Sequence, residues 1–270
     1  MIKVFYTTIR DRYGAVLIYC AAVVGIIFMY VGLYPALQSQ SQQYAEIFKS
    51  FPESFLKAFG FESAQAFFLS LESFMSAEQY SLTWPILGVI LSMSFAANNI
   101  VHEIEKGTIE FILSLPLSRL KFYFGRYFAG LFLLAIFTAL SVLPVIPIAK
   151  LYDVSCVWEN YFKLSLGAFL FIGAIYSITT FFSAITNEKS KTYAFSAGIV
   201  ITMYVLNILS SLKENLENLQ YFSFFHYFSA SKLLVDGEID IHLVWVFSLT
   251  IVIFTVLGAI AYSRRDIATS

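Results

Sequence analysis

The side chains most able to do chemistry lie between residues 102 and 119. Three carboxylates, Glu103, Glu105 and Glu110, stand close to Gly107 and Thr108. Glycine can break a helix at this point, and a threonine can then cap a new helix. Glu110 falls in the first turn of that helix, where the helix dipole favours an acid. The pattern predicts a short, separately bounded helix with acidic flanks.

The sequence also predicts where this short helix ends. Pro116 disfavours helical geometry at Leu115, which limits the helix to about two turns. Ser118 can cap the following helix, in which Arg119 is the first of several basic residues. The segment is therefore predicted to be a short helix with a start and an end of its own.

The sequence lacks the residue patterns for nucleotide binding, metal binding and catalysis within the membrane. Lys106, Gly107 and Thr108 do not form a nucleotide-binding loop, because the upstream glycine and the preceding strand are missing. The histidines and cysteines are not clustered at metal-ligand spacing. We expect no cofactor and no metal in this chain, and a membrane-embedded enzyme is improbable because no apolar window carries an Asp, Glu or His.

The elements that position the acidic segment are membrane spans. The chain has 270 residues, of which 59% are hydrophobic and 13% charged, about half the charged fraction of a soluble domain. A bilayer core of about 30 Å needs about 20 apolar residues in a helix. Six stretches meet this test without Asp, Glu, Lys or Arg, at residues 15–37, 82–100, 127–148, 164–185, 194–212 and 243–262.

The basic residues predict how these spans are oriented. With both termini in the cytoplasm, the inside segments hold 11 of the 17 Lys and Arg residues, as the positive-inside rule requires. We therefore predict an all-α, polytopic protein of the cell (plasma) membrane, with residues 1–270 in a single domain. Residues 2–13 are expected to form an interfacial helix that ends before Gly14.

Two outside segments are also predicted to be structured. Residues 38–81 contain two amphipathic clusters, around 55–59 and 67–75, which predict two short helices resting on the outer membrane face or on the helix bundle. An aromatic run at 221–228 precedes the last span. It is too short to cross the membrane, so we expect an interfacial or re-entrant segment.

Polar residues within or at the ends of the second and fifth spans allow two interpretations. They could line a translocation path, or they could form hydrogen bonds between helices. These residues are Ser92, Ser94, Asn98, Asn99, Thr202 and Asn207.

The acidic segment falls on the cytoplasmic side, where positive charge gathers next to anionic lipid. A protein partner would explain the carboxylates there, although a solvated connection between two spans would also fit.

The motif Glu105-Lys106-Gly107-Thr108-Ile109-Glu110, followed by Leu113-Ser114-Leu115-Pro116-Leu117-Ser118-Arg119, resembles the signature of type-2 ATP-binding-cassette transporter permeases. The layout of the whole chain is similar to that family. The resemblance implies that the segment is a coupling helix that seats in an ATP-binding subunit. The positions that carry this role over are Glu103, Glu105, Gly107, Thr108, Glu110, Pro116 and Arg119.

The resemblance also implies the partners. The chain would be one permease subunit, paired with a second in a homo- or heterodimer, and ATP and Mg would bind to separate ATP-binding subunits. No nucleic-acid partner is expected. The long first outside loop is similar to peptide, antibiotic or copper-maturation branches, and the expected activity is export of a peptide, antibiotic or lipid-like substrate. The alternative is a non-transporting sensory or assembly subunit on the same scaffold.

Overall fold

The computed structural model describes residues 1–40, 69–109, 118–212 and 214–265, and in these ranges the chain is helical with no strand. Six helical stretches are long and apolar enough to cross a membrane. This confirms the predicted all-α, six-span class. Each observed stretch covers most or all of a predicted window, but the boundaries differ in ways that have physical causes.

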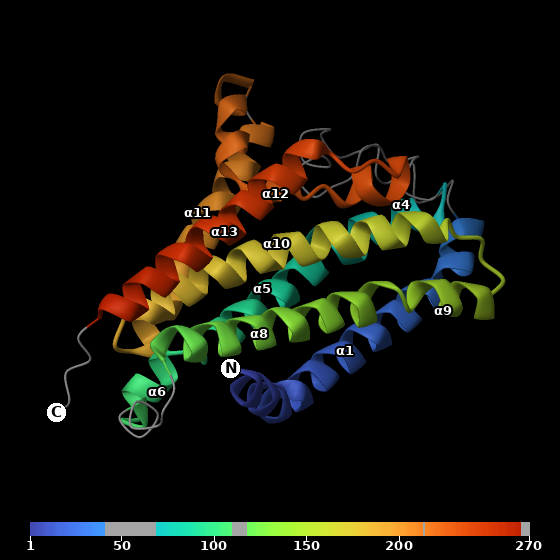
Figure 1. Cartoon of the computed structure of the whole chain (residues 1–270). Coiled ribbons are helices and arrows are strands. Elements are labelled where there is room, and N and C mark those ends of the chain that lie inside the picture. Colours follow the sequence, from blue (N-terminus) through green and yellow to red (C-terminus); the bar gives the residue numbers. More distant parts are fainter. Residues whose placement is uncertain (41–68, 110–117, 213, 266–270) are drawn as a thin grey trace.

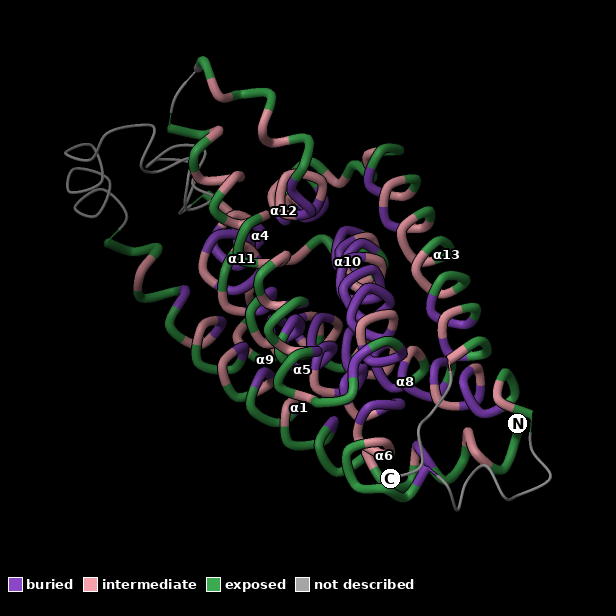
Figure 2. Tube along the Cα trace, turned by 90° about the vertical axis from the view of Figure 1, so that its left-hand side faces the viewer, coloured by how far each residue is buried: buried purple, intermediate pink, exposed green. Residues whose placement is uncertain are grey.

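The first stretch is one helix, α1 (Ile2–Ser39), without a break at Gly14. At 1.5 Å per residue its 38 residues extend about 57 Å, well beyond a bilayer core. Figures 1 and 2 show its first turns running in a different direction from the rest. The predicted helix boundary at Gly14 is therefore wrong, and the interfacial position of residues 2–13 stays a prediction.

The second stretch begins earlier than predicted. It joins α4 (Leu71–Met75), the π-helix η2 (Ser76–Thr83) and α5 (Trp84–Ala97) into one run from Leu71 to Ala97. Ser70 caps its start by accepting a hydrogen bond from the Ser73 amide. The part of the 67–75 cluster that the structure describes packs on the bundle, with Phe74 against Tyr30 of α1, and continues into the span. The 55–59 cluster lies outside the described residues.

This longer helix also carries two acids before the predicted window of residues 82–100. Glu72 and Glu78 both lie in it, and Glu72 is buried. The Glu72 carboxylate accepts a hydrogen bond of 2.7 Å from the Val157 amide. A charge-free window misses such a residue because it treats every position as lipid-exposed.

The third predicted span is broken. It consists of α8 (Arg119–Val142) and α9 (Val145–Leu151), separated at Leu143 and Pro144. Proline has no amide hydrogen to continue the helical bonding, and its ring clashes with the preceding turn.

The three remaining spans include the central helix of the bundle, α10 (Trp158–Ile185). The other two are α11 (Lys189–Leu212) and α13 (Ile241–Arg264). Helix α10 packs against α5, α8, α11 and α13, and α1 packs against α8. Figure 2 shows α10 buried over most of its length, while α11 is largely exposed.

The aromatic run packs against the middle of α10 and against α13. It contains the end of a 3-10 helix, η3 (Glu214–Phe222), and the short α12 (Phe224–Tyr227), and is followed by the π-helix η4 (Lys232–Asp236). Phe228 stacks on Phe171 of α10 at 4.9 Å between ring centroids, and Phe224 meets Phe247 of α13 at 5.3 Å. The run is anchored in the bundle by these rings; its depth in a membrane stays a prediction.

One end of the bundle gathers the segments predicted to be cytoplasmic. The short helix α6 (Val101–Glu105), the start of α8 and the ends of α10 and α13 lie together there (Figure 1). We call this the α6 end. The Arg119 guanidinium at the start of α8 donates to the Arg265 carbonyl after α13 at 2.5 Å, and Arg265 donates to the Ala184 carbonyl of α10 at 2.8 Å.

Candidate functional site

The turn after α6 begins the predicted coupling segment. Helix α6 ends at Glu105, and Gly107 takes a φ of +70°, a left-handed conformation that favours glycine. The predicted break at Gly107 is confirmed. Glu105, Lys106, Gly107 and Thr108 are exposed, whereas Ile109 is buried. The turn therefore exposes one acid, Glu105, and one base, Lys106.

The rest of the coupling segment lies outside the described residues, including Glu110 and Pro116. Its exit is described. The Ser118 hydroxyl accepts a hydrogen bond from the Lys121 amide, which confirms the predicted cap of the helix that follows. Arg119 is held by the Arg265 carbonyl, so this residue of the motif ties the segment to the end of α13.

Glu103 points back into the protein. Its carboxylate forms an ion pair of 2.6 Å with Arg126 of α8, and both side chains are 16% exposed. The Thr108 hydroxyl donates a very short hydrogen bond to the same carboxylate. Burial raises the pKa of Glu103, but the hydrogen bond from Thr108 and the charge of Arg126 outweigh it, so the pKa is lowered. Glu103 thus stays ionised and links the turn to α8.

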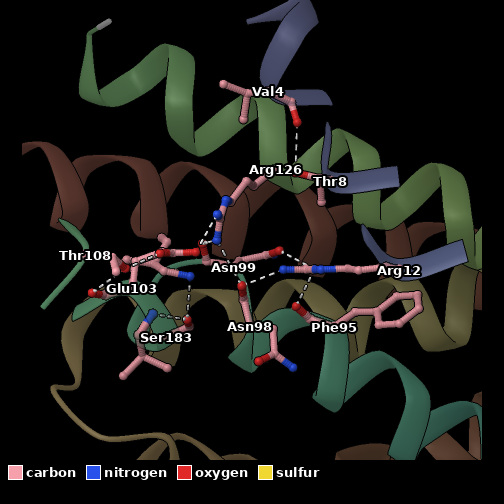
Figure 3. A network of polar contacts seen from close by, with 12 residues as sticks. Val4, Thr8, Arg12, Phe95, Asn98, Asn99, Glu103, Thr108, Arg126 and Ser183 are labelled. Carbon is pink, nitrogen blue, oxygen red and sulfur yellow. Dashed lines mark hydrogen bonds and ion pairs between the residues drawn. The ribbon is translucent and has the colours of Figure 1, made fainter. Parts of the chain in front are cut away.

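Arg126 and Arg12 bind the segment between the end of α5 at Ala97 and the start of α6 at Val101. The helix leaves backbone carbonyls without amide partners there. Arg126 donates to the carbonyls of Asn98 at 3.1 Å and Asn99 at 2.8 Å. Arg12 of α1 donates to the carbonyls of Phe95 at 2.9 Å and Asn98 at 2.5 Å. Figure 3 shows the two guanidinium groups converging on Asn98 and Asn99.

The amide side of the same break is held by α10. The Ser183 hydroxyl accepts hydrogen bonds from the amides of Ile100 at 3.3 Å and Val101 at 3.1 Å. The Asn99 side-chain amide donates to the Tyr176 hydroxyl at 2.6 Å, and its oxygen accepts from Arg12 at 2.9 Å. We call residues 98–100 the hinge, since side chains from α1, α8 and α10 supply the bonds that helix geometry does not.

Sequence reasoning missed most of this network. Arg12 counted only as a basic residue before the first span, and it lies more than 80 residues from its acceptors. Arg126 was recognised only as a charge that sets orientation. The Asn98–Asn99 pair at the end of an apolar window was the one local signal available.

The residues predicted to line a translocation path lie in two places, on α5 with the hinge and on α11. Ser92 and Asn99 are buried, and Ser92 donates to the Val89 carbonyl of its own helix. The bonds of Asn99 favour its interpretation as a contact between helices. Asn98 donates to the Ser94 carbonyl. On α11, Thr202 is exposed and lines an open hollow, and Asn207 is half-buried.

An apolar groove runs between α5 and α11. Two adjoining hollows of about 200 and 240 Å³ share Val89, Ile90, Val200 and Ile201 in their walls. The first reaches Ser81 and Phe225, and the second reaches Met93 and Tyr193. The groove follows α5 from η2 toward the α6 end, and its walls are almost entirely hydrocarbon.

A comparison with known families gives one match that spans nearly the whole chain. The model of a family described as "ABC-2 family transporter protein" matches residues 1–267. No curated protein matches the chain.

Proposed function

The chain belongs to the ABC-2 family of transporter proteins, and on that premise we propose that it docks a separate ATP-binding subunit through residues 102–119. As a permease subunit it supplies the membrane path, and the partner supplies ATP hydrolysis with ATP and Mg. A second permease subunit, identical or related, completes the pair. The α6 end lies in the cytoplasm of a cell whose plasma membrane the helices span.

The exposed turn Glu105–Thr108 is the observation that supports docking most strongly. It follows α6, and the hinge before α6 is bonded inside the protein, so Glu105 and Lys106 are available to a partner. Glu103 and Arg119 of the motif take a different role in this proposal. They anchor the two ends of the segment, at α8 and at the end of α13.

The α5–α11 groove supports an apolar or amphipathic substrate. Its walls offer hydrocarbon with few polar groups, so a charged solute would lose its hydration there without replacement. We propose export of a peptide, antibiotic or lipid-like molecule whose apolar part lies in this groove. Thr202 lines a separate hollow with Gly198 and Phe222, so it is not part of this groove.

Co-purification tests the docking. A tagged chain is expressed with a candidate ATP-binding subunit from a neighbouring gene, and capture of that subunit is measured. The double variant Glu105→Arg/Glu110→Arg should weaken capture at least about tenfold, or about 1.4 kcal/mol. Glu217→Arg, an exposed charge reversal on η3 at a distance from the segment, is the matched control. Unchanged capture and ATP turnover in a folded double variant would refute the docking.

A further inference from the structure

We propose that Arg12 and Arg126 are positioning residues that make the hinge transmit movement of the coupling turn to α1 and α8. This inference rests on the proposed function, because it needs a partner that moves the turn. It assigns the role to the two guanidinium groups that hold residues 98–100.

The first step is from the turn to α8. Thr108 and Glu103 are joined by a hydrogen bond, and Glu103 is joined to Arg126 by the ion pair. A displacement of the turn therefore acts on Arg126 through two short polar contacts. Arg126 lies near the start of α8, and its other bonds reach the hinge carbonyls.

The second step is from the hinge to α1. The acceptors of Arg12 are the carbonyls of Phe95 and Asn98 and the side-chain oxygen of Asn99, and all three are neutral. The partial negative charge at the end of a helix stabilises a cation there. If the hinge moved without α1, the guanidinium would lose these oxygens while still enclosed, and an enclosed charge without acceptors is costly. Helix α1 must follow the hinge.

The third step is the contact with α10, which is expected to act as the fixed point. Ser183 and Tyr176 hold the hinge from the central helix, which packs against four others. The Tyr176 hydroxyl also donates to the Tyr127 carbonyl of α8 at 3.1 Å. Movement of the turn is thus guided about α10 toward α1 and α8.

Hydrogen–deuterium exchange on the complex with the ATP-binding subunit, with and without ATP, tests this inference. In the wild type, ATP should change exchange both at residues 98–106 and at residues 8–16. In Arg12→Met the ATP-dependent change at 98–106 should remain, and that at 8–16 should fall by at least half. A purely structural role would instead change exchange at 8–16 equally with and without ATP, and that result would overturn the inference.

Two further variants keep the test decisive. Arg10→Met removes an exposed arginine of the same helix and should behave as the wild type. If Arg12→Met does not fold, Arg12→Lys keeps the charge but cannot make all three bonds, and it should give an intermediate loss at 8–16. A full ATP response at 8–16 in either Arg12 variant overturns the inference alone. No ATP response in the wild type, or no assembly, overturns the proposed function with it.

Discussion

At the scale of single residues, the charges around the hinge do not balance. Arg12 and Arg126 contribute two positive charges, and Glu103 contributes one negative charge within bonding distance. The remaining positive charge is stabilised by carbonyl oxygens and by the Phe95 ring, 5.8 Å from the Arg12 guanidinium. The network therefore depends on the position of each oxygen, and we expect single substitutions in it to lower the stability of the protein.

Glu103→Gln should lower the melting temperature of the purified protein by several degrees. The change removes a charge-assisted bond to Arg126, and such bonds contribute about 1.5–3 kcal/mol. Thermal unfolding followed by intrinsic fluorescence measures the shift. Glu105→Gln, at an exposed position two residues away, is the control and should leave the temperature unchanged. Equal melting temperatures for the two variants would show that the ion pair contributes nothing.

The same pair predicts a pH dependence. The pKa of Glu103 is lowered in the folded state from its usual 4.5, so the folded state binds this proton less readily than the unfolded state. The stabilisation is present above pH 4.5 and is lost as the pH falls through the folded pKa. The melting-temperature difference between wild type and Glu103→Gln should be constant from pH 8 to 5.5 and shrink in more acidic buffer. A difference that grows on acidification would contradict the lowered pKa.

Sequence reasoning reaches these residues unevenly. Gly107 and Ser118 act locally, so their turn and cap could be predicted from neighbours in the chain. Glu103 was assigned to a partner because its bond to Arg126 crosses 23 positions and has no spacing signal. The role of Arg12 could not be predicted for the same reason, because its acceptors are not near it in the sequence.

At the scale of elements, the turn at Gly107 fixes where the coupling segment leaves α6. Gly107→Ala should destabilise the turn by about 1–2 kcal/mol, because a side chain disfavours the left-handed backbone while the space around it is open. Exchange of the amides at 103–109 should rise. Gly14→Ala, which also meets open space but lies in a regular helix, is the matched control and should be neutral or stabilising. Similar exchange in both variants would show that the turn does not require glycine.

A second element-scale prediction concerns the contact of α8 with α10. A Cβ atom at Gly130 would lie only 2.1 Å from the Tyr176 hydroxyl, so Gly130→Ala must displace Tyr176 and its bond to Asn99. Overpacking of this kind costs about 1–3 kcal/mol. The melting temperature should fall, whereas Gly198→Ala on α11 has open space and should not change it. A stable Gly130→Ala protein would show that the helices separate easily at this contact.

The helix boundaries show how far composition alone can go. Six apolar windows gave the number of spans, because charge is excluded where helices meet lipid. The windows missed the first turns of the second span, where Glu72 is buried and bonded, and the break at Pro144 inside the third. Both errors come from the assumption that a span is an unbroken helix with every side chain facing lipid.

At the scale of the whole molecule, the six spans differ strongly in how far they are buried. Helix α10 is the most buried of the six spans and α11 the least. The charged network lies at one end, and the apolar groove between α5 and α11 runs toward it. In the proposed transporter, ATP acts at the α6 end and the substrate moves along α11.

Site-specific photo-crosslinking in the assembled complex tests docking at the α6 end most directly. A photoreactive amino acid is placed at Glu105 in one variant and at Asp153, in the turn after α9, in another. Docking at the α6 end should give a crosslink to the ATP-binding subunit from position 105 and none from position 153. A crosslink from 153 with none from 105 would place the partner at the opposite end and contradict it.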